Sequence, residues 1–185
     1  MLKGCASLES IDVSHFDISS IRGFGYLFCG CSKLTSLNLS NFYTANGDSM
    51  ANMFENYNSL ESLDLNSFDT SQITTINHMF YNWNSLISLI LGNFDLSSAT
   101  NLESMFNYCN KIISLDLRDF KISHDAYINI NIDNIFNNCN NNLTVCYEET
   151  IDERLKNILG RYRNNCLCFE NSYKLFYHRL LFKRW

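Results

Sequence analysis

The sequence predicts an α/β fold: a right-handed solenoid of about six repeats, each with one short parallel strand and one short helix. Hydrophobic residues recur at a fixed step of 26 positions, and within each unit their spacing changes from two to three or four. The step is clearest in two phenylalanine columns: Phe28, Phe54, Phe80 and Phe106, and Phe16, Phe42, Phe68, Phe94 and Phe120. A fixed period of this length is typical of a stack with an extended surface.

The strand of each repeat is predicted by alternation of leucine with polar residues. In the third repeat, Leu63 and Leu65 alternate with Ser62, Asp64 and Asn66, as in a strand with one buried face. Equivalent strands are expected to lie parallel at a spacing of about 4.8 Å. The six predicted strands are Ile11–Val13, Leu37–Leu39, Leu63–Leu65, Leu89–Leu91, Leu115–Leu117 and Val145–Tyr147.

The helix of each repeat is predicted by a different spacing. Ile73, Ile76, Met79 and Phe80 step by three and four, which indicates about two helical turns. Asp69 precedes this segment and can accept N–H groups at a helix start. A strand and a short helix repeating at this length form the plan of leucine-rich repeats. On that plan the phenylalanines stack as offset aromatic pairs, so we expect them to be structural.

The predicted solenoid covers residues 1–147, with repeats near 2–27, 28–53, 54–79, 80–105, 106–135 and 136–147. The step from Phe106 to Phe136 is 30 positions, so four residues are inserted, and we expect them within 124–131. Met1 shares a column with Met53, Met79 and Met105, so the first repeat lacks a cap. We expect the chain to be part of a longer array, able to associate end to end through this uncapped repeat.

Residues 148–185 are predicted to form a helical cap and a basic aromatic tail. The run Thr150–Glu153 fits a capping box, and Leu155, Leu159 and Gly160 then predict a helix over about 150–159. Further on, one helical face collects apolar residues, and basic residues lie mostly off it: Tyr173, Phe176, Tyr177, Leu180 and Leu181, against Lys174, His178, Arg179, Lys183 and Arg184. Such a segment can bind membrane surfaces or come from a shifted reading frame, but we expect it to pack on its own protein.

The charge and the hydropathy of the chain exclude several classes of protein. The chain has a net charge of −5, and residues 1–146 contain 6 Lys and Arg against 14 Asp and Glu. The repeats therefore offer no basic surface for nucleic acid. No apolar run reaches 18 residues, which predicts no transmembrane helix, and the N-terminus lacks the basic and apolar pattern by which a signal peptide is identified.

The cysteine column contains Cys5, Cys31, Tyr57, Trp83, Cys109 and Cys139. A position that accepts cysteine, tyrosine and tryptophan requires apolar bulk, so we expect buried free thiols. Cys5 and Cys31 would lie about 5 Å apart on adjacent strands, and the sequence leaves open whether they form a disulfide. The pairs Cys29–Cys31 and Cys166–Cys168 lack zinc-type spacing, and the histidines share no column. We expect no metal, no cofactor and no enzyme.

The exposed strand face is the candidate binding site. Its members are a serine ladder and a neighbouring acidic ladder: Ser10, Ser36, Ser62, Ser88 and Ser114, and Asp12, Asn38, Asp64, Ile90 and Asp116. In a solenoid these residues point to the concave surface, where partners bind. The face could take a basic or polar protein or a sugar, and a merely solvated face is the open alternative. A flat ladder does not converge the six or more oxygens that calcium requires.

The repeats resemble a known family. The pattern M-F-x-x-C-x-x-L-x-S-L-D-L-S-x-F-D-x-S-x-[VI]-T-x-M is matched best from Met79 to Asp95 and from Met53 to Thr74. Over residues 1–147 the chain resembles the BspA-like leucine-rich repeats, also described in mycoplasmas as the DUF285 or PARCEL repeat. The resemblance implies a secreted or cell-surface adhesin or antigen that binds host proteins.

We therefore expect a non-catalytic protein-binding and adhesion module whose concave strand face binds a partner such as a host or extracellular-matrix protein. The alternative is a fragment, a structural or antigenic repeat cassette, or an intracellular interaction scaffold, without a ligand site of its own.

Overall fold

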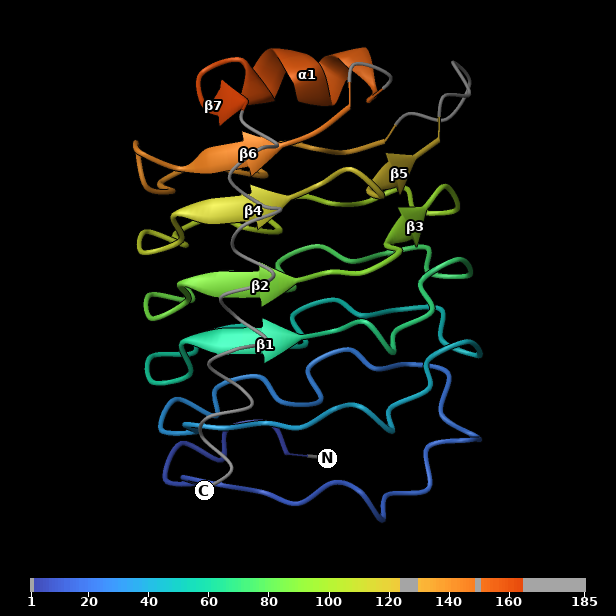
Figure 1. The fold of residues 1–185 in the computed structure, drawn as a ribbon. Coiled ribbons are helices and arrows are strands. Elements are labelled where there is room, and N and C mark those ends of the chain that lie inside the picture. The colour runs from blue at the N-terminus through green and yellow to red at the C-terminus, as the bar shows by residue number, and fades with distance from the viewer. Residues whose placement is uncertain (1, 124–129, 149–150, 165–185) are drawn as a thin grey trace.

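The computed structural model describes residues 2–123, 130–148 and 151–164. These residues form strands and loops with one helix, arranged as layers that lie above one another (Figure 1). Four short strands follow the stack on one side: β1 (Ser62–Asp64), β2 (Ser88–Ile90), β4 (Ser114–Asp116) and β6 (Thr144–Cys146). β1 pairs with β2 and β4 with β6, each in parallel, and equivalent leucines such as Leu63 and Leu89 lie opposite each other.

These strands begin and end one residue earlier than the sequence predicted. β1 and β4 end at the aspartate column because Asp64 and Asp116 accept the N–H two residues on, which turns the chain. The predicted strands Ile11–Val13 and Leu37–Leu39 are not strands in the structure. Among the described backbone groups, a single hydrogen bond, from Thr35 N–H to Glu9 O at 3.1 Å, joins these layers near the strand position. A single hydrogen bond is too few to pair these two segments as strands.

Three two-residue strands were not predicted. β3 (Asp95–Leu96) and β5 (Lys121–Ile122) pair in parallel just after the phenylalanine of their repeats. β7 (Arg163–Asn164) adds to the far edge of β6. The pairing also locates the insertion: Leu96 lies opposite Ile122, a step of 26, but Asn101 lies opposite Asn131, a step of 30. The four extra residues therefore lie between Ile122 and Asn131, as predicted.

The segments predicted as repeat helices are turns. Every fourth residue there has a positive φ, as at Asn52, Asn56, His78 and Asn82, and the right-handed helix does not allow this. The N–H groups that a helix would use internally instead bond to the next repeat, as from Phe54 to Met79 O and from Asn56 to Tyr81 O, both at 2.9 Å. We call this series of bonds, over residues 24–30, 50–56, 76–82, 102–108 and 132–138, the turn ladder.

The core lies between the strands and the turn ladder, and both phenylalanine columns are buried there apart from half-buried Phe16. One column extends over Phe28, Phe54, Phe80, Phe106 and Phe136, with successive ring centroids 5.8, 5.9, 5.3 and 5.1 Å apart and rings within 15° of parallel. This confirms the predicted aromatic stack. Each pair of this kind adds about 0.5–1.5 kcal/mol beyond the burial of its area.

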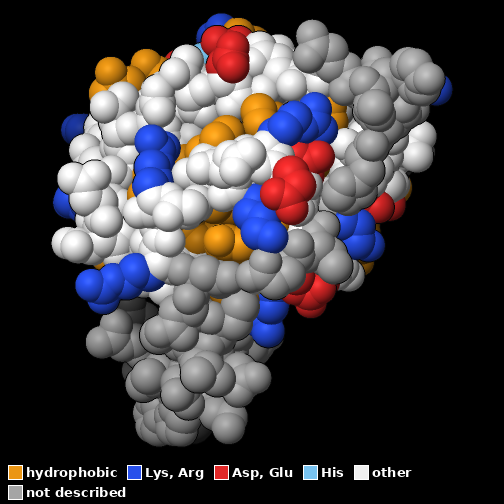
Figure 2. Space-filling view, turned by 90° about the horizontal axis from the view of Figure 1, so that it is seen from above, with side chains coloured by type: hydrophobic (Ala, Val, Ile, Leu, Met, Phe, Trp, Pro, Cys, Tyr) orange, Lys and Arg blue, Asp and Glu red, His pale blue; other side chains and the backbone are white. Residues whose placement is uncertain are grey.

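The single helix of the described residues, α1 (Glu153–Leu159), covers the last repeat with buried Leu155 and Leu159. Asp152 caps it by accepting the Arg154 N–H, so the helix is shorter than predicted, and Thr150 lies outside the described residues. Gly160 ends it in a right-handed rather than a left-handed conformation. Figure 2 shows this end, where basic and acidic side chains lie side by side, and Arg154 pairs with Asp152 at 2.9 Å. Of the helices described, none is long and apolar enough to cross a membrane.

Candidate binding surface on the strand face

The structure gives the predicted ladder residues different surroundings. Ser10, Ser36 and Ser62 are exposed, while Ser88 and Ser114 are half-buried. Asp12, Asn38 and Asp64 are exposed, and Asp116 is half-buried. Ile90 is only 8 % exposed, which corrects its inclusion as a contact residue. Pairing places Ser62 opposite Ser88 and Asp64 opposite Ile90, so β1 and β2 do form one continuous surface.

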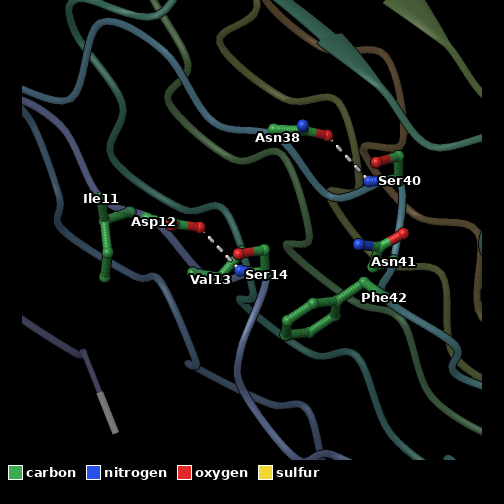
Figure 3. A pocket seen from close by; sticks show the side chains of 8 residues that line it. All are labelled: Ile11, Asp12, Val13, Ser14, Asn38, Ser40, Asn41 and Phe42. Atoms are coloured by element: carbon green, nitrogen blue, oxygen red, sulfur yellow. Dashed lines mark hydrogen bonds between the residues drawn. The ribbon is translucent and has the colours of Figure 1, made fainter.

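The acidic ladder has a structural role that the sequence analysis missed. Asp12, Asn38, Asp64 and Asp116 each accept the backbone N–H of the residue two positions on, at 2.9, 3.0, 2.9 and 3.1 Å. Figure 3 shows the first two of these bonds, from Ser14 to Asp12 and from Ser40 to Asn38. Bonds from Ser14 also lower the pKa of Asp12. The recurring acceptor two residues before a turn was the signal in the sequence.

The fourth repeat, which lacks the side-chain acceptor, supports this role of the acidic ladder in the turns. Ile90 offers no acceptor, and two residues later Gly92 adopts a φ of +59°. A Cβ atom at Gly92 would lie 2.8 Å from Asn66 Oδ1 and 3.0 Å from Asn66 Cα. Glycine therefore makes the turn where the side-chain acceptor is absent, because it alone adopts this conformation without a steric cost.

A second acidic column lies just beyond the phenylalanines. Asp17, Asp69 and Asp95 each accept the N–H of a serine two residues on, at 3.0 Å. The serine hydroxyls of Ser19 and Ser71 donate to the same oxygens at 2.6 and 2.7 Å. Hydrogen bonds from Ser19 and Ser97, first from the side chain and then from the backbone, lower the pKa values of Asp17 and Asp95. The carboxylates of Asp17 and Asp95 therefore stay charged at neutral pH.

The two columns, together with Asp119, form an acidic edge, which we define as Asp12, Asp17, Asp64, Asp69, Asp95, Asp116 and Asp119. Shallow hollows line this edge. One of about 230 Å³ lies among Asn66, Gly92, Asn93, Asp116 and Asp119, and another lies among Leu37, Asn38, Ser40, Asp64 and Ser67. A third is framed by Asp12, Ser14, Asn38 and Phe42 (Figure 3). Small-molecule sites are usually deeper and more apolar than these hollows.

Two basic side chains interrupt the edge. Arg118 pairs with Asp116 at 2.6 Å, and Lys121 stands in β5 where other repeats place Asp17, Asp69 or Asp95. The edge is therefore most acidic in the first, third and fourth repeats, has no acid in the second, and is partly neutralised in the fifth.

Isoleucines also reach the surface beside the strands. Ile87 and Ile113 are 39 % and 54 % exposed, directly before β2 and β4. Equivalent positions in the first three repeats hold Glu9, Thr35 and Glu61. The change from polar to apolar within this column was visible in the sequence but was not singled out.

The cysteines agree in part with the expected buried thiols, because Cys29, Cys31, Cys109 and Cys139 are buried but Cys5 is half-buried. Cys5, Cys29, Cys31, Cys109 and Cys139 are free, so the structure contains no Cys5–Cys31 disulfide. Burial raises the pKa of Cys29 to about 11 and that of Cys139 to about 12. Cys146 of β6 is disulfide-bonded. No three His, Cys, Asp or Glu side chains of the described segments are grouped to hold a metal ion. Cys166, Cys168, His124 and His178 lie outside the described residues.

Comparisons with known proteins give one match. No curated protein and no solved structure matches the chain. The model of one family, described as a mycoplasma protein of unknown function, DUF285, matches residues 1–120, which include the first four repeats and most of the strand face. The chain therefore belongs to the DUF285 family.

Proposed function

We propose that this chain is a non-catalytic protein-binding module: a right-handed, leucine-rich-repeat-like solenoid whose strand face binds a protein partner. The observation that carries the proposal is the acidic edge, which recurs at equivalent positions in the first, third, fourth and fifth repeats, whereas the second repeat has Asn38 and Tyr43 there. The turns hold its carboxylates in fixed positions, so a partner pays little entropy to meet them. A basic, extended segment of the partner is the best complement to a shallow acidic strip.

The proposed setting is the cell surface or the extracellular space, with a host or extracellular-matrix protein as partner. Two observations support it. The repeats resemble a family of surface proteins, and Cys146 forms a disulfide bond, a modification that persists mainly in oxidising compartments.

A second candidate is a structural or antigenic repeat cassette without a ligand of its own. One observation favours it: most members of the acidic edge already serve the turns of their own repeats. In that case the aspartates recur in columns because the turn of each repeat requires one, and not because a partner binds them.

Charge variants that keep the turns separate the two candidates. Asparagine can accept the same N–H as aspartate, as Asn38 does, but carries no charge. A triple variant Asp12→Asn, Asp64→Asn and Asp69→Asn should therefore keep its stability and lose binding. The measurement is biolayer interferometry against purified basic extracellular-matrix proteins, at low and high salt.

The control variant makes the same charge change on the turn ladder side, with Asp48→Asn, Glu55→Gln and Glu103→Gln. We expect at least tenfold weaker binding for the strand-face variant and unchanged binding for the control. Equal binding by both variants, or binding by neither the wild type nor the variants, would favour the repeat cassette.

A further inference from the structure

Two pairs of free cysteines occupy adjacent places in the cysteine column: Cys5 with Cys31, and Cys109 with Cys139. The second thiol of each pair makes the same contact with the repeat before it. Cys31 Sγ donates to Leu2 O at 3.3 Å, three residues before Cys5. Cys139 Sγ donates to Phe106 O at 3.1 Å, three residues before Cys109. The two pairs therefore stack in the same way from one repeat to the next.

The backbone brings Cys5 and Cys31 within reach of each other. The Gly4 N–H donates to Cys29 O at 2.7 Å, so the two repeats are hydrogen-bonded directly before the cysteines. A Cβ atom at Gly30 would lie only 3.5 Å from Gly4 Cα. Equivalent Cα atoms of stacked repeats lie about 5 Å apart, which a disulfide spans without backbone movement. Burial first, and then the neighbouring Cys5, raise the pKa of the Cys31 thiol, as expected for two thiols in proximity.

Exposure distinguishes the two pairs. Cys5 is half-buried, whereas Cys31, Cys109 and Cys139 are buried. Exchange between a thiol and a dissolved disulfide requires a thiol that the reagent can reach. Of these two pairs, a dissolved disulfide therefore reaches only the one that contains Cys5.

A covalent link at this place would restrain the first repeat where the strand side restrains it little. Near the strand position, a single backbone hydrogen bond among the described groups, from Thr35 N–H to Glu9 O, joins the first two repeats. On the turn side, the Leu2 N–H donates to Leu27 O at 3.0 Å. Segments held by few hydrogen bonds open locally at low cost, so a bond between the repeats would slow this opening.

We propose that Cys5 and Cys31 are a redox-active thiol pair, which a small dissolved disulfide such as oxidised glutathione converts into an intrachain disulfide that fastens the first repeat to the second. The reaction goes beyond the proposed function and does not depend on it. An oxidising compartment is the setting in which such a disulfide persists.

The reaction has two exchange steps. The Cys5 thiolate attacks one sulfur of oxidised glutathione, which forms a mixed disulfide and releases one glutathione thiolate. Cys31 then gives up its proton and attacks the Cys5 sulfur, which forms the protein disulfide and releases the second glutathione. Two protein thiols are oxidised and one glutathione disulfide is reduced to two thiols, so atoms and electrons balance.

Peptide mapping of the full chain tests the pairing. The purified protein is incubated with oxidised glutathione, free thiols are blocked with iodoacetamide at successive times, and the chain is digested with trypsin without reduction. Cleavage after Lys3, Arg22 and Lys33 gives peptides 4–22 and 23–33, which contain the two cysteines. We expect these peptides to become linked at least tenfold faster than Cys109 becomes linked to Cys139.

Two serine variants identify the sulfur that resolves the mixed disulfide. Cys31→Ser should stop the reaction after its first step, with glutathione retained on Cys5. Cys29→Ser is the matched control, because Cys29 is on the same peptide and buried, but its Sγ faces Glu55 Oε2 at 3.7 Å. This control should form the linked peptides at the rate of the wild type.

Hydrogen exchange then measures the effect on the first repeat. Oxidation should slow exchange in residues 2–23 at least fivefold in the wild type and leave it unchanged in Cys31→Ser. Four results would overturn the proposal: a glutathione adduct that persists on Cys5 in the wild type, a link from Cys5 to Cys29, equal rates for the two pairs, or unchanged exchange in the linked protein. None of them bears on partner binding, which the charge variants test separately.

Discussion

Tyr57 and Trp83 occupy equivalent positions in successive repeats, and their ring centroids lie 4.9 Å apart in the core. Both side chains are fully buried, but their polar atoms differ. Trp83 Nε1 donates to Leu60 O at 2.7 Å, whereas the Tyr57 hydroxyl has no hydrogen-bond partner among the described residues. Burial, reinforced by the Cys31 thiol, raises the pKa of Tyr57, so the hydroxyl stays neutral.

This difference predicts opposite effects of two similar substitutions. A buried hydroxyl without a partner costs about 1–3 kcal/mol, so Tyr57→Phe should increase the free energy of unfolding by about 1 kcal/mol. Trp83→Phe removes a satisfied hydrogen bond and leaves a cavity, so it should decrease the free energy of unfolding by about 2 kcal/mol or more. Urea denaturation followed by circular dichroism measures both. A marked loss of stability in Tyr57→Phe would show that the hydroxyl has an unrecognised partner.

The backbone at Gly92 leads to a second prediction. Alanine there would adopt a left-handed conformation, which costs about 1 kcal/mol, and its Cβ would crowd the backbone of Asn66. We therefore expect Gly92→Ala to lower the free energy of unfolding by about 2 kcal/mol. Gly23→Ala is the control, because Gly23 has an ordinary φ and a Cβ there meets no atom within 4 Å. Its effect should stay within about 0.5 kcal/mol, and equal losses for both variants would contradict this account of Gly92.

The hydrogen-bonded aspartates make stability depend on pH at the acidic end. The folded-state pKa values of Asp17 and Asp95 lie below the usual 3.8. A group of this kind stabilises the fold fully above its unfolded pKa, and the contribution is lost as pH falls through the folded pKa. The melting temperature should therefore drop as pH falls below about 4. The double variant Asp17→Asn and Asp95→Asn should show a smaller drop between pH 5 and pH 2.

Thermal scans of three chains at each pH make the comparison. The third chain, Asp48→Asn, loses an exposed carboxylate that accepts no hydrogen bond from the described residues, and its profile should follow the wild type. An unchanged acid profile in the double variant would show that these turns are equally stable with either protonation state.

The sequence predicted what depends on burial and period. The phenylalanine columns, the parallel register and the four-residue insertion before Asn131 all follow from hydrophobic spacing, and the structure has them. The prediction of repeat helices was wrong because the spacing of Ile73, Ile76 and Met79 fits consecutive turns as well as a helix. Hydrophobic spacing does not reveal whether an N–H bonds within its own segment or to the next repeat. The asparagines at positions 52, 56 and 82 were the clue, because asparagine tolerates a positive φ.

The sequence predicted where the candidate surface lies, but not that its side chains stabilise the turns of the fold. The sequence placed Asp64 on the outside of a strand, and the structure agrees. That its carboxylate would turn towards the Asn66 N–H depends on backbone conformation after the strand, which hydrophobic alternation does not specify. Ile90 was included because its column is acidic elsewhere, although its side chain favours burial at that position.

The aromatic stack predicts how the repeats unfold. Phe80 is fully buried and stacks on Phe54 at 5.9 Å and on Phe106 at 5.3 Å, so it couples the repeats on either side. Phe80→Ala should cost about 4 kcal/mol and weaken this coupling, because each repeat of such a stack contacts only its neighbours. Half-buried Phe16, in the first repeat, is the matched control. We expect Phe16→Ala to cost less, about 1–2 kcal/mol, and to affect mainly its own repeat.

Hydrogen exchange with mass spectrometry distinguishes these effects. In Phe80→Ala, protection should fall on both sides of residue 80, and the denaturation curve should broaden or split as the two halves unfold at different denaturant concentrations. In Phe16→Ala, exchange should rise only in the first two repeats. A sharp single transition in Phe80→Ala, with uniform loss of protection along the chain, would mean that stability does not pass from repeat to repeat through the phenylalanines.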